Sequence, residues 1–82
     1  MFEVMVHVEM FSNKAGHRNH RNNLGLLGQF ESYNEALSAC YEDANNWTSY
    51  PNEVEWSMRK GELVGFHPDM PQSEVHYDII KI

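Results

Sequence analysis

The sequence predicts an α+β fold, in which an antiparallel β-sheet of four to five strands carries one α-helix packed on one face. Several short segments alternate apolar with polar residues, which is typical of half-buried strands. One central segment instead repeats its apolar residues at spacings of three and four, which is typical of an amphipathic helix. The predicted order is β-β-α-β-β-β, and a single helix can cover only one face of such a sheet.

The first strand is the clearest, because an apolar side chain recurs at every second position over residues 2–11. The stretch that begins at residue 12 is rich in Asn, Gly and charge, and it predicts a loop. The apolar run 24–30 predicts a second strand, in which Gly25 and Gly28 favour bulges. A loop between consecutive strands favours an antiparallel pair.

The helix is predicted to begin after Ser32 and to run to about Trp47. Ser32 and Glu35 have the spacing of a capping box, in which each residue bonds the backbone N–H of the other. Pro51 ends the helical pattern. The predicted apolar stripe consists of Tyr33, Ala36, Leu37, Cys40, Tyr41, Ala44 and Trp47.

Three more strands are predicted after the helix. The third covers 53–59, and Lys60-Gly61 is a plausible two-residue hairpin turn to the fourth, at 62–67. The last strand covers 75–82. Its alternation does not say which side faces the helix, because large apolar residues occupy both.

With 82 residues, the chain is predicted to form a single domain, 1–82. Cys40 is its one cysteine, so no internal disulfide is expected, which suits a reducing, cytoplasmic location. Charged residues interrupt the apolar N-terminal segment, and no apolar run is long enough for a membrane span. Neither a signal peptide nor a membrane association is expected.

The charge is unevenly distributed along the chain. Residues 1–30 carry two acids and three bases, a net charge of +1, whereas residues 31–82 carry ten acids and three bases, a net charge of -7. This balance disfavours direct binding to nucleic acid and favours a basic protein partner. A simpler explanation is that the acids keep a small protein in solution.

Neither a metal, a cofactor nor a catalytic residue is predicted. His17 and His20 have a spacing that zinc sites use, but such a site needs three or four ligands, and two neighbouring arginines repel a cation. The single Cys40 lies on the apolar stripe of the helix, where a buried, unreactive thiol is expected. The sequence contains no G-x-S-x-G, P-loop, C-x-x-C or H-E-x-x-H motif, so an enzyme is not expected.

Two groups of residues are candidates for binding. The predicted helix has no Lys or Arg, and exposed apolar residues on the strands favour a protein interface. The predicted protein-binding residues are Glu35, Glu42, Asp43, Glu53, Glu55, Met5 and Phe11. The second group is a basic loop that suits carboxylates or phosphates and contains Lys14, Arg18 and Arg21.

These features predict a small acidic non-catalytic protein that covers a basic site on a larger protein, such as a nucleic-acid-processing complex. In size, charge and layout the chain resembles phage-encoded inhibitors, including anti-CRISPR, anti-restriction and transcription-inhibitor proteins. The resemblance rests on no motif, and no family is assigned. The alternative is a nucleic-acid-associated module that contacts phosphate through loop 14–21. The exposed apolar residues also fit a homodimer.

Overall fold

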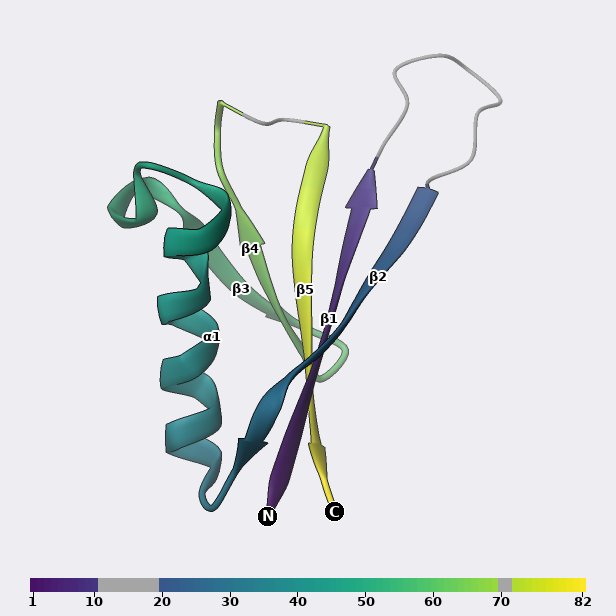
Figure 1. Cartoon of the computed structure of the whole chain (residues 1–82). Coiled ribbons are helices and arrows are strands. Elements are labelled where there is room, and N and C mark those ends of the chain that lie inside the picture. The colour runs from purple at the N-terminus through teal and green to yellow at the C-terminus, as the bar shows by residue number, and fades with distance from the viewer. Residues whose placement is uncertain (11–19, 70–71) are drawn as a thin grey trace.

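The computed structural model describes residues 1–10, 20–69 and 72–82, and Figure 1 shows the arrangement of their elements. The predicted fold class and element order are confirmed, because five antiparallel strands form one sheet with one helix packed against it. The elements are β1 (Phe2–Met10), β2 (His20–Phe30), α1 (Tyr33–Trp47), a 3-10 turn (Pro51–Glu53), β3 (Glu55–Arg59), β4 (Glu62–Phe66) and β5 (Ser73–Lys81).

The strand order is β2-β1-β5-β4-β3, so the first and last strands of the chain lie side by side near the middle of the sheet. β2 begins at His20, earlier than the predicted residue 24, because its polar first residues pair through the backbone with the end of β1. Two register shifts interrupt this pairing near Gly25 and Gly28, where bulges were predicted. Gly25 has a φ of +99°, which only glycine adopts readily.

The β3–β4 hairpin turns at Lys60 and Gly61, as predicted. Both residues have positive φ, 52° and 82°, which is the geometry of a type I′ turn. The third strand is shorter than predicted, because residues 51–53 form the 3-10 turn instead of extended backbone. The hairpin therefore adds two short strands at the edge of the sheet.

The core lies between α1 and the face of the sheet that the helix covers. Val4 and Val6 of β1 stand beside Ile79 and Tyr77 of β5 on this face. On the helix side, the small buried residues are Ala36, Cys40 and Ala44, which let the helix backbone approach the strands closely. The sequence did not indicate which side of β5 faces the helix. In the structure, residues 75, 77 and 79 face it.

The predicted apolar stripe of the helix is too wide. Tyr33 and Tyr41 are 41% and 43% exposed, although both were assigned to the buried stripe. Because the buried centre of the helix consists of small residues, these larger rings lie at the margins of the interface. Each makes an edge-to-face contact there, Tyr33 with Phe2 and Tyr41 with Trp56.

Tyr77 connects the sheet to the last turns of the helix. Its ring is fully buried, its hydroxyl donates to the Asp43 carboxylate at 2.6 Å, and the Trp47 indole N–H donates to the same hydroxyl at 2.9 Å. Burial and the Asp43 carboxylate raise the pKa of Tyr77 far above its usual value. Asp43 was expected to face outward, but it is half-buried and holds this tyrosine in place.

We expect Tyr77→Phe to destabilise the fold by about 1–3 kcal/mol, because it leaves the Trp47 N–H and the Asp43 carboxylate without their shared partner. The free energy of unfolding in urea measures this loss. The matched control is Tyr41→Phe, which removes an exposed hydroxyl and is expected to change stability by less than about 0.5 kcal/mol. Equal stabilities for the two variants would contradict the role of the Tyr77 hydroxyl.

The buried Cys40 thiol makes stability depend on alkaline pH. Burial, with a smaller contribution from Asp43, raises the pKa of Cys40 from 9.0 to about 12. Above pH 9 the unfolded chain releases this proton while the folded chain keeps it, so unfolding is favoured as the pH rises towards 12.

We expect the free energy of unfolding of the wild type to fall between pH 9 and 11 more steeply than that of Cys40→Ala, by up to about 1.4 kcal/mol per pH unit. Denaturant titrations at a series of pH values measure both slopes. Tyr77 is present in both proteins, so its own titration cancels in the comparison. Parallel slopes would show that Cys40 ionises as readily in the folded protein as in the unfolded chain.

Candidate functional site

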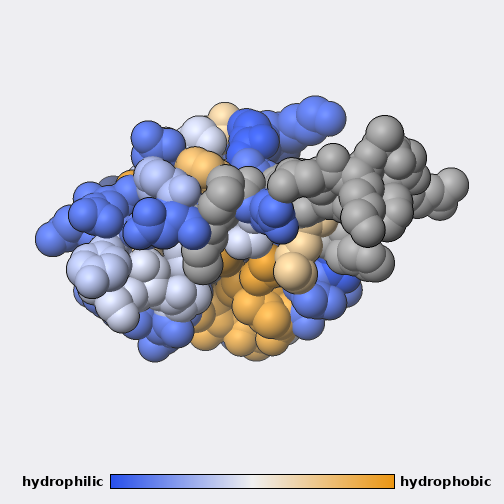
Figure 2. Space-filling view, turned by 90° about the horizontal axis from the view of Figure 1, so that it is seen from above, coloured by the Kyte–Doolittle hydropathy of each residue, from blue (hydrophilic) through white to orange (hydrophobic). Residues whose placement is uncertain are grey.

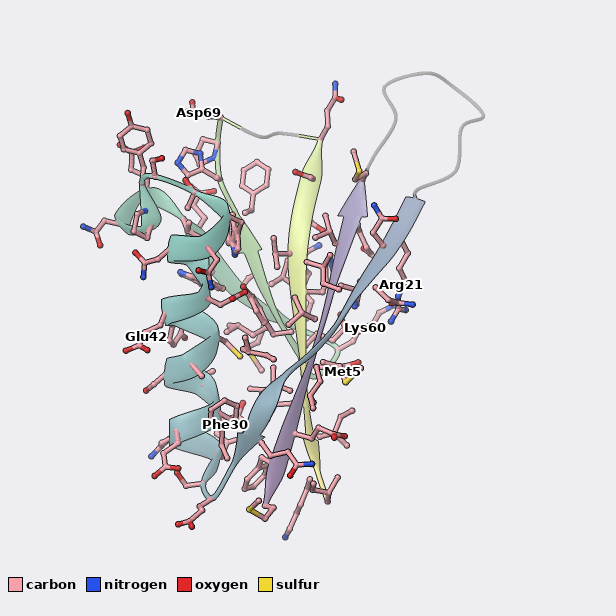
Figure 3. All side chains as sticks on the ribbon, viewed as in Figure 1. Met5, Arg21, Phe30, Glu42, Lys60 and Asp69 are labelled. Atoms are coloured by element: carbon pink, nitrogen blue, oxygen red, sulfur yellow. The ribbon has the colours of Figure 1, made fainter. Side chains whose placement is uncertain are left out.

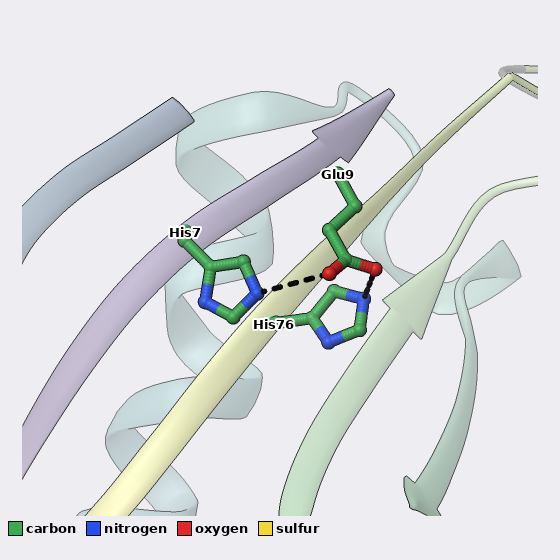
Figure 4. Close-up of side chains that lie close together, drawn as sticks. All are labelled: His7, Glu9 and His76. Carbon is green, nitrogen blue, oxygen red and sulfur yellow. Dashed lines mark ion pairs between the residues drawn. The ribbon is translucent and has the colours of Figure 1, made fainter. Parts of the chain in front are cut away.

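Two histidines meet on the face of the sheet that points away from α1. The register of β1 and β5 places His7 directly opposite His76. Their rings stack with centroids 4.6 Å apart and an interplanar angle of 20°. The two residues are only 3% and 7% exposed, which is rare for polar side chains on a sheet face without a helix. Figure 4 shows both rings on the near side of the strands, with the helix behind them.

Three carboxylates surround this pair. The Nδ1 atom of His76 lies 2.7 Å from a Glu62 oxygen, and its Nε2 atom lies 3.1 Å from Glu9 and 3.2 Å from Glu74. The Nε2 atom of His7 also points towards Glu9, at 3.7 Å, as the dashed line in Figure 4 shows. Glu9 therefore stands between the two imidazole rings. These five residues form what we call the His–Glu cluster.

The His–Glu cluster has an excess of negative charge. Arg59 forms an ion pair with Glu74 and is the arginine that contacts the cluster among the described residues. The three carboxylates of the cluster outnumber the two basic side chains beside it, Arg59 and Lys60. A hollow of about 250 Å³ opens over this region, and its walls are Glu9, Arg59, Lys60, Glu62 and His76.

The contacts of His76 require more positive charge than a neutral ring provides. A neutral imidazole has one N–H, yet both nitrogens of His76 face carboxylate oxygens at hydrogen-bonding distance. One of these contacts therefore needs a second ring proton or a bound cation. Of the cluster, His7, Glu9 and His76 have donor atoms close enough together to hold a metal ion.

The sequence did not predict this cluster. Its histidine pair of interest was His17 and His20, whose side chains lie outside the described residues. The one sequence feature that indicated part of this cluster was the alternation along the first strand, which placed His7 and Glu9 on the same side. The sequence did not show which strand pairs with the first one. His76 lies 69 residues further along the chain, so only the fold brings it beside His7.

A second group of candidate ligands surrounds His67, which is 3% exposed. Its Nδ1 atom accepts a hydrogen bond from the Asp69 backbone N–H at 3.0 Å, so the neutral ring carries its proton on Nε2. Within the described part of the chain the Nε2 atom has no hydrogen-bond partner, although a Glu53 oxygen lies 3.3 Å away. The carboxylates of Glu53 and Asp69 are mainly exposed to solvent.

The outer face of α1 is the second candidate surface. Residues 31–53 contain five acids and neither Lys, Arg nor His. Glu35 and Glu42 are exposed and line a depression of about 460 Å³ together with Phe30 and Ala39. Within residues 1–10, 20–69 and 72–82, neither glutamate forms an ion pair. Figure 3 shows Glu42 on the opposite side of the molecule from Arg21 and Lys60.

The structure does not bring all predicted protein-binding residues together. Glu35 and Glu42 share the helix face, whereas Met5 and Glu55 lie on the open face of the sheet, with β5 and β4 between their strands. Glu53 lies on the 3-10 turn beside His67. The predicted surface is thus divided between several parts of the molecule.

Most of the predicted basic loop lies outside the described residues, as do Lys14, Arg18 and Phe11. Arg21 is described, and it is exposed on the edge strand β2, where its Nε–H donates to the Asn23 side-chain oxygen at 3.2 Å. Its guanidinium is therefore accessible from solvent. The predicted contact of Arg21 with an anionic partner stays a prediction.

Exposed apolar side chains occur on the open face of the sheet, as the sequence predicted. Met5 is 37% exposed and pairs across the strands with Leu26, which is also exposed. Ile80 of β5 is exposed on the same face, one pair further along. Seen from above, the molecule also shows one area of hydrophobic residues between hydrophilic margins (Figure 2). The surface is therefore not uniformly polar.

Comparisons of this chain with protein-family models, with curated proteins and with solved structures found no significant match. Among the described residues, no helix combines the length and the apolar composition that a membrane crossing requires. The function is therefore inferred from the chemistry of this chain's own residues.

Proposed function

We propose that this chain is a small, non-catalytic cytoplasmic binding protein that docks the acidic outer face of α1 onto a basic site of a larger protein. The observation that carries the proposal is the charge of residues 31–53, where five acids stand without a single base. Stability alone does not favour this composition, since the last turn of α1 has no basic residue to complement the helix dipole.

The depression beside Glu35 and Glu42 suits basic side chains. The two glutamates are seven residues apart, which corresponds to about 10.5 Å along the helix axis. Phe30 and Ala39 line the same depression and offer an apolar surface. The aliphatic stem of an Arg or Lys can lie on this surface while its charged group bonds a glutamate carboxylate. The Phe30 ring also favours a cation over its face.

Docking of this kind would block the partner's basic site. Carboxylates would take positions that phosphates otherwise occupy, and charge complementarity would speed the encounter. More specifically, we propose that the chain is an inhibitor of the phage-encoded type and that it acts on a nucleic-acid-processing complex. The alternative is direct phosphate contact through loop 14–21, to which the exposed Arg21 belongs by its position at the start of β2.

The test reverses two charges on the helix face. Glu35→Lys/Glu42→Lys changes the net charge by +4, from -6 to -2. The matched control, Glu55→Lys/Asp69→Lys, makes the same change at exposed acids outside the helix. Fluorescence anisotropy measures binding of a synthetic helical peptide that carries two arginines seven residues apart, and affinity capture with mass spectrometry compares protein partners.

We expect the helix variant to lose at least ten-fold in peptide affinity and to lose its main captured partner, because each swap replaces attraction by repulsion. The control is expected to change affinity less than three-fold. Equal losses would show that only net charge matters and would contradict docking through α1. Salt-sensitive binding of single-stranded DNA by the wild type, abolished by Arg21→Ala, would instead support the phosphate-contact alternative.

A further inference from the structure

We propose that His7, Glu9 and His76 bind a divalent transition-metal ion of the zinc class on the face of the sheet opposite α1. Each residue offers one ligand atom, and these atoms all lie within 4.8 Å of one another. Figure 4 shows the two Nε2 atoms and the Glu9 carboxylate converging on the same space. Two imidazoles and one carboxylate form a ligand set that catalytic and transport zinc sites use.

The distances between the ligand atoms suit a small ion. Zinc binds nitrogen and oxygen at about 2.0–2.2 Å, so two ligands of a tetrahedral ion stand about 3.4 Å apart. The Nε2 atom of His76 lies 3.1 Å from Glu9, and that of His7 lies 3.7 Å from Glu9. These two values lie on either side of the zinc value, and each concerns a different oxygen of the Glu9 carboxylate.

The orientation of His76 is an independent sign of a metal ligand. Histidines that bind a metal through one nitrogen generally donate the other N–H to a carboxylate, which fixes the ring. In this structure Glu62 lies 2.7 Å from Nδ1 of His76, and Nε2 is directed towards Glu9 and Glu74. Glu62 therefore acts as a positioning residue for His76.

Charge and access also favour a divalent cation. The three carboxylates of the His–Glu cluster outnumber Arg59 and Lys60, the two bases beside it, so a cation is attracted to the region. The hollow over Glu9, Glu62 and His76 gives the ion a path from solvent and leaves room for water as a further ligand. Imidazole nitrogen favours Zn²⁺, Ni²⁺, Cu²⁺ or Fe²⁺ over Mg²⁺ and Ca²⁺, which prefer oxygen ligands.

The His67 group is less suited to the same role. The Nδ1 atom of His67 already accepts the Asp69 backbone N–H, and the Glu53 and Asp69 carboxylates extend into solvent. Among the described residues, Glu53 and Asp69 are the carboxylates near its ring, and both belong to the candidate ligand group, so neither is left to orient His67 as Glu62 orients His76. The two groups are distinguishable by substitution, because they share no residue.

The experiment titrates the full chain, first treated with a chelator, with Zn²⁺ alone and follows the heat of binding. The decisive variant is Glu9→Gln, which keeps the shape of a partly exposed side chain and removes a ligand charge. Glu62→Gln tests the positioning role. Glu53→Gln is the matched control in the other group, and His17→Gln/His20→Gln controls for the loop histidines. Circular dichroism checks that each variant is folded.

We expect one Zn²⁺ per chain, at least ten-fold weaker binding by Glu9→Gln and a 10–100-fold loss in Glu62→Gln. The Glu53 and loop-histidine variants are expected to bind as the wild type does. In the wild type, Zn²⁺ should shift the ¹⁵N signals of Nε2 in both His7 and His76, which tests the site even where a variant unfolds.

The proposal is overturned if Zn²⁺ does not bind, if Glu9→Gln binds as tightly as the wild type, or if the ring signals of His7 and His76 do not move. Binding that disappears in the Glu53 or loop-histidine variants would place the ion elsewhere. Since α1 lies on the other face, the outcome is separate from that of the helix-charge experiment.

Discussion

The pairing of β1 with β5 is the contact on which both faces of the molecule depend. Side chains alternate along each strand, so one register decides two sets of neighbours at once. On the helix face it puts Val6 beside Tyr77, within the apolar core. On the other face it puts His7 beside His76 and brings Glu9 close to both. A shift of β1 by one residue would turn His7 towards the helix and Val4 and Val6 away from it.

The helix is held on this sheet by small residues and by one buried polar connection. Ala36, Cys40 and Ala44 present little volume, so the helix backbone lies close to the strands and excludes water from the core. Tyr77 then bonds Asp43 and Trp47 at the far end of the helix. The apolar centre supplies the free energy of burial, and the polar connection selects one position of the helix over its alternatives.

This arrangement separates two kinds of acidic residue. Glutamates on the outer face of α1 have no basic neighbour among the described residues, and their side chains are exposed to solvent. On the sheet face, Glu9, Glu62 and Glu74 instead lie against two imidazoles and Arg59, within the molecule. The first set suits a protein partner, and the second suits a small ion. The sheet and helix core between them keep the two sets on opposite sides, where each can act without the other.

The order of elements, the helix start at Ser32 and the Lys60-Gly61 turn were predictable from the sequence, because hydrophobic period, capping and turn chemistry are local properties. The absence of bases from the helix was likewise visible without coordinates. The inward position of Asp43 and the meeting of His7 with His76 were not. Both depend on contacts between residues 34 and 69 positions apart, and only the strand order and register of the folded sheet bring those residues together.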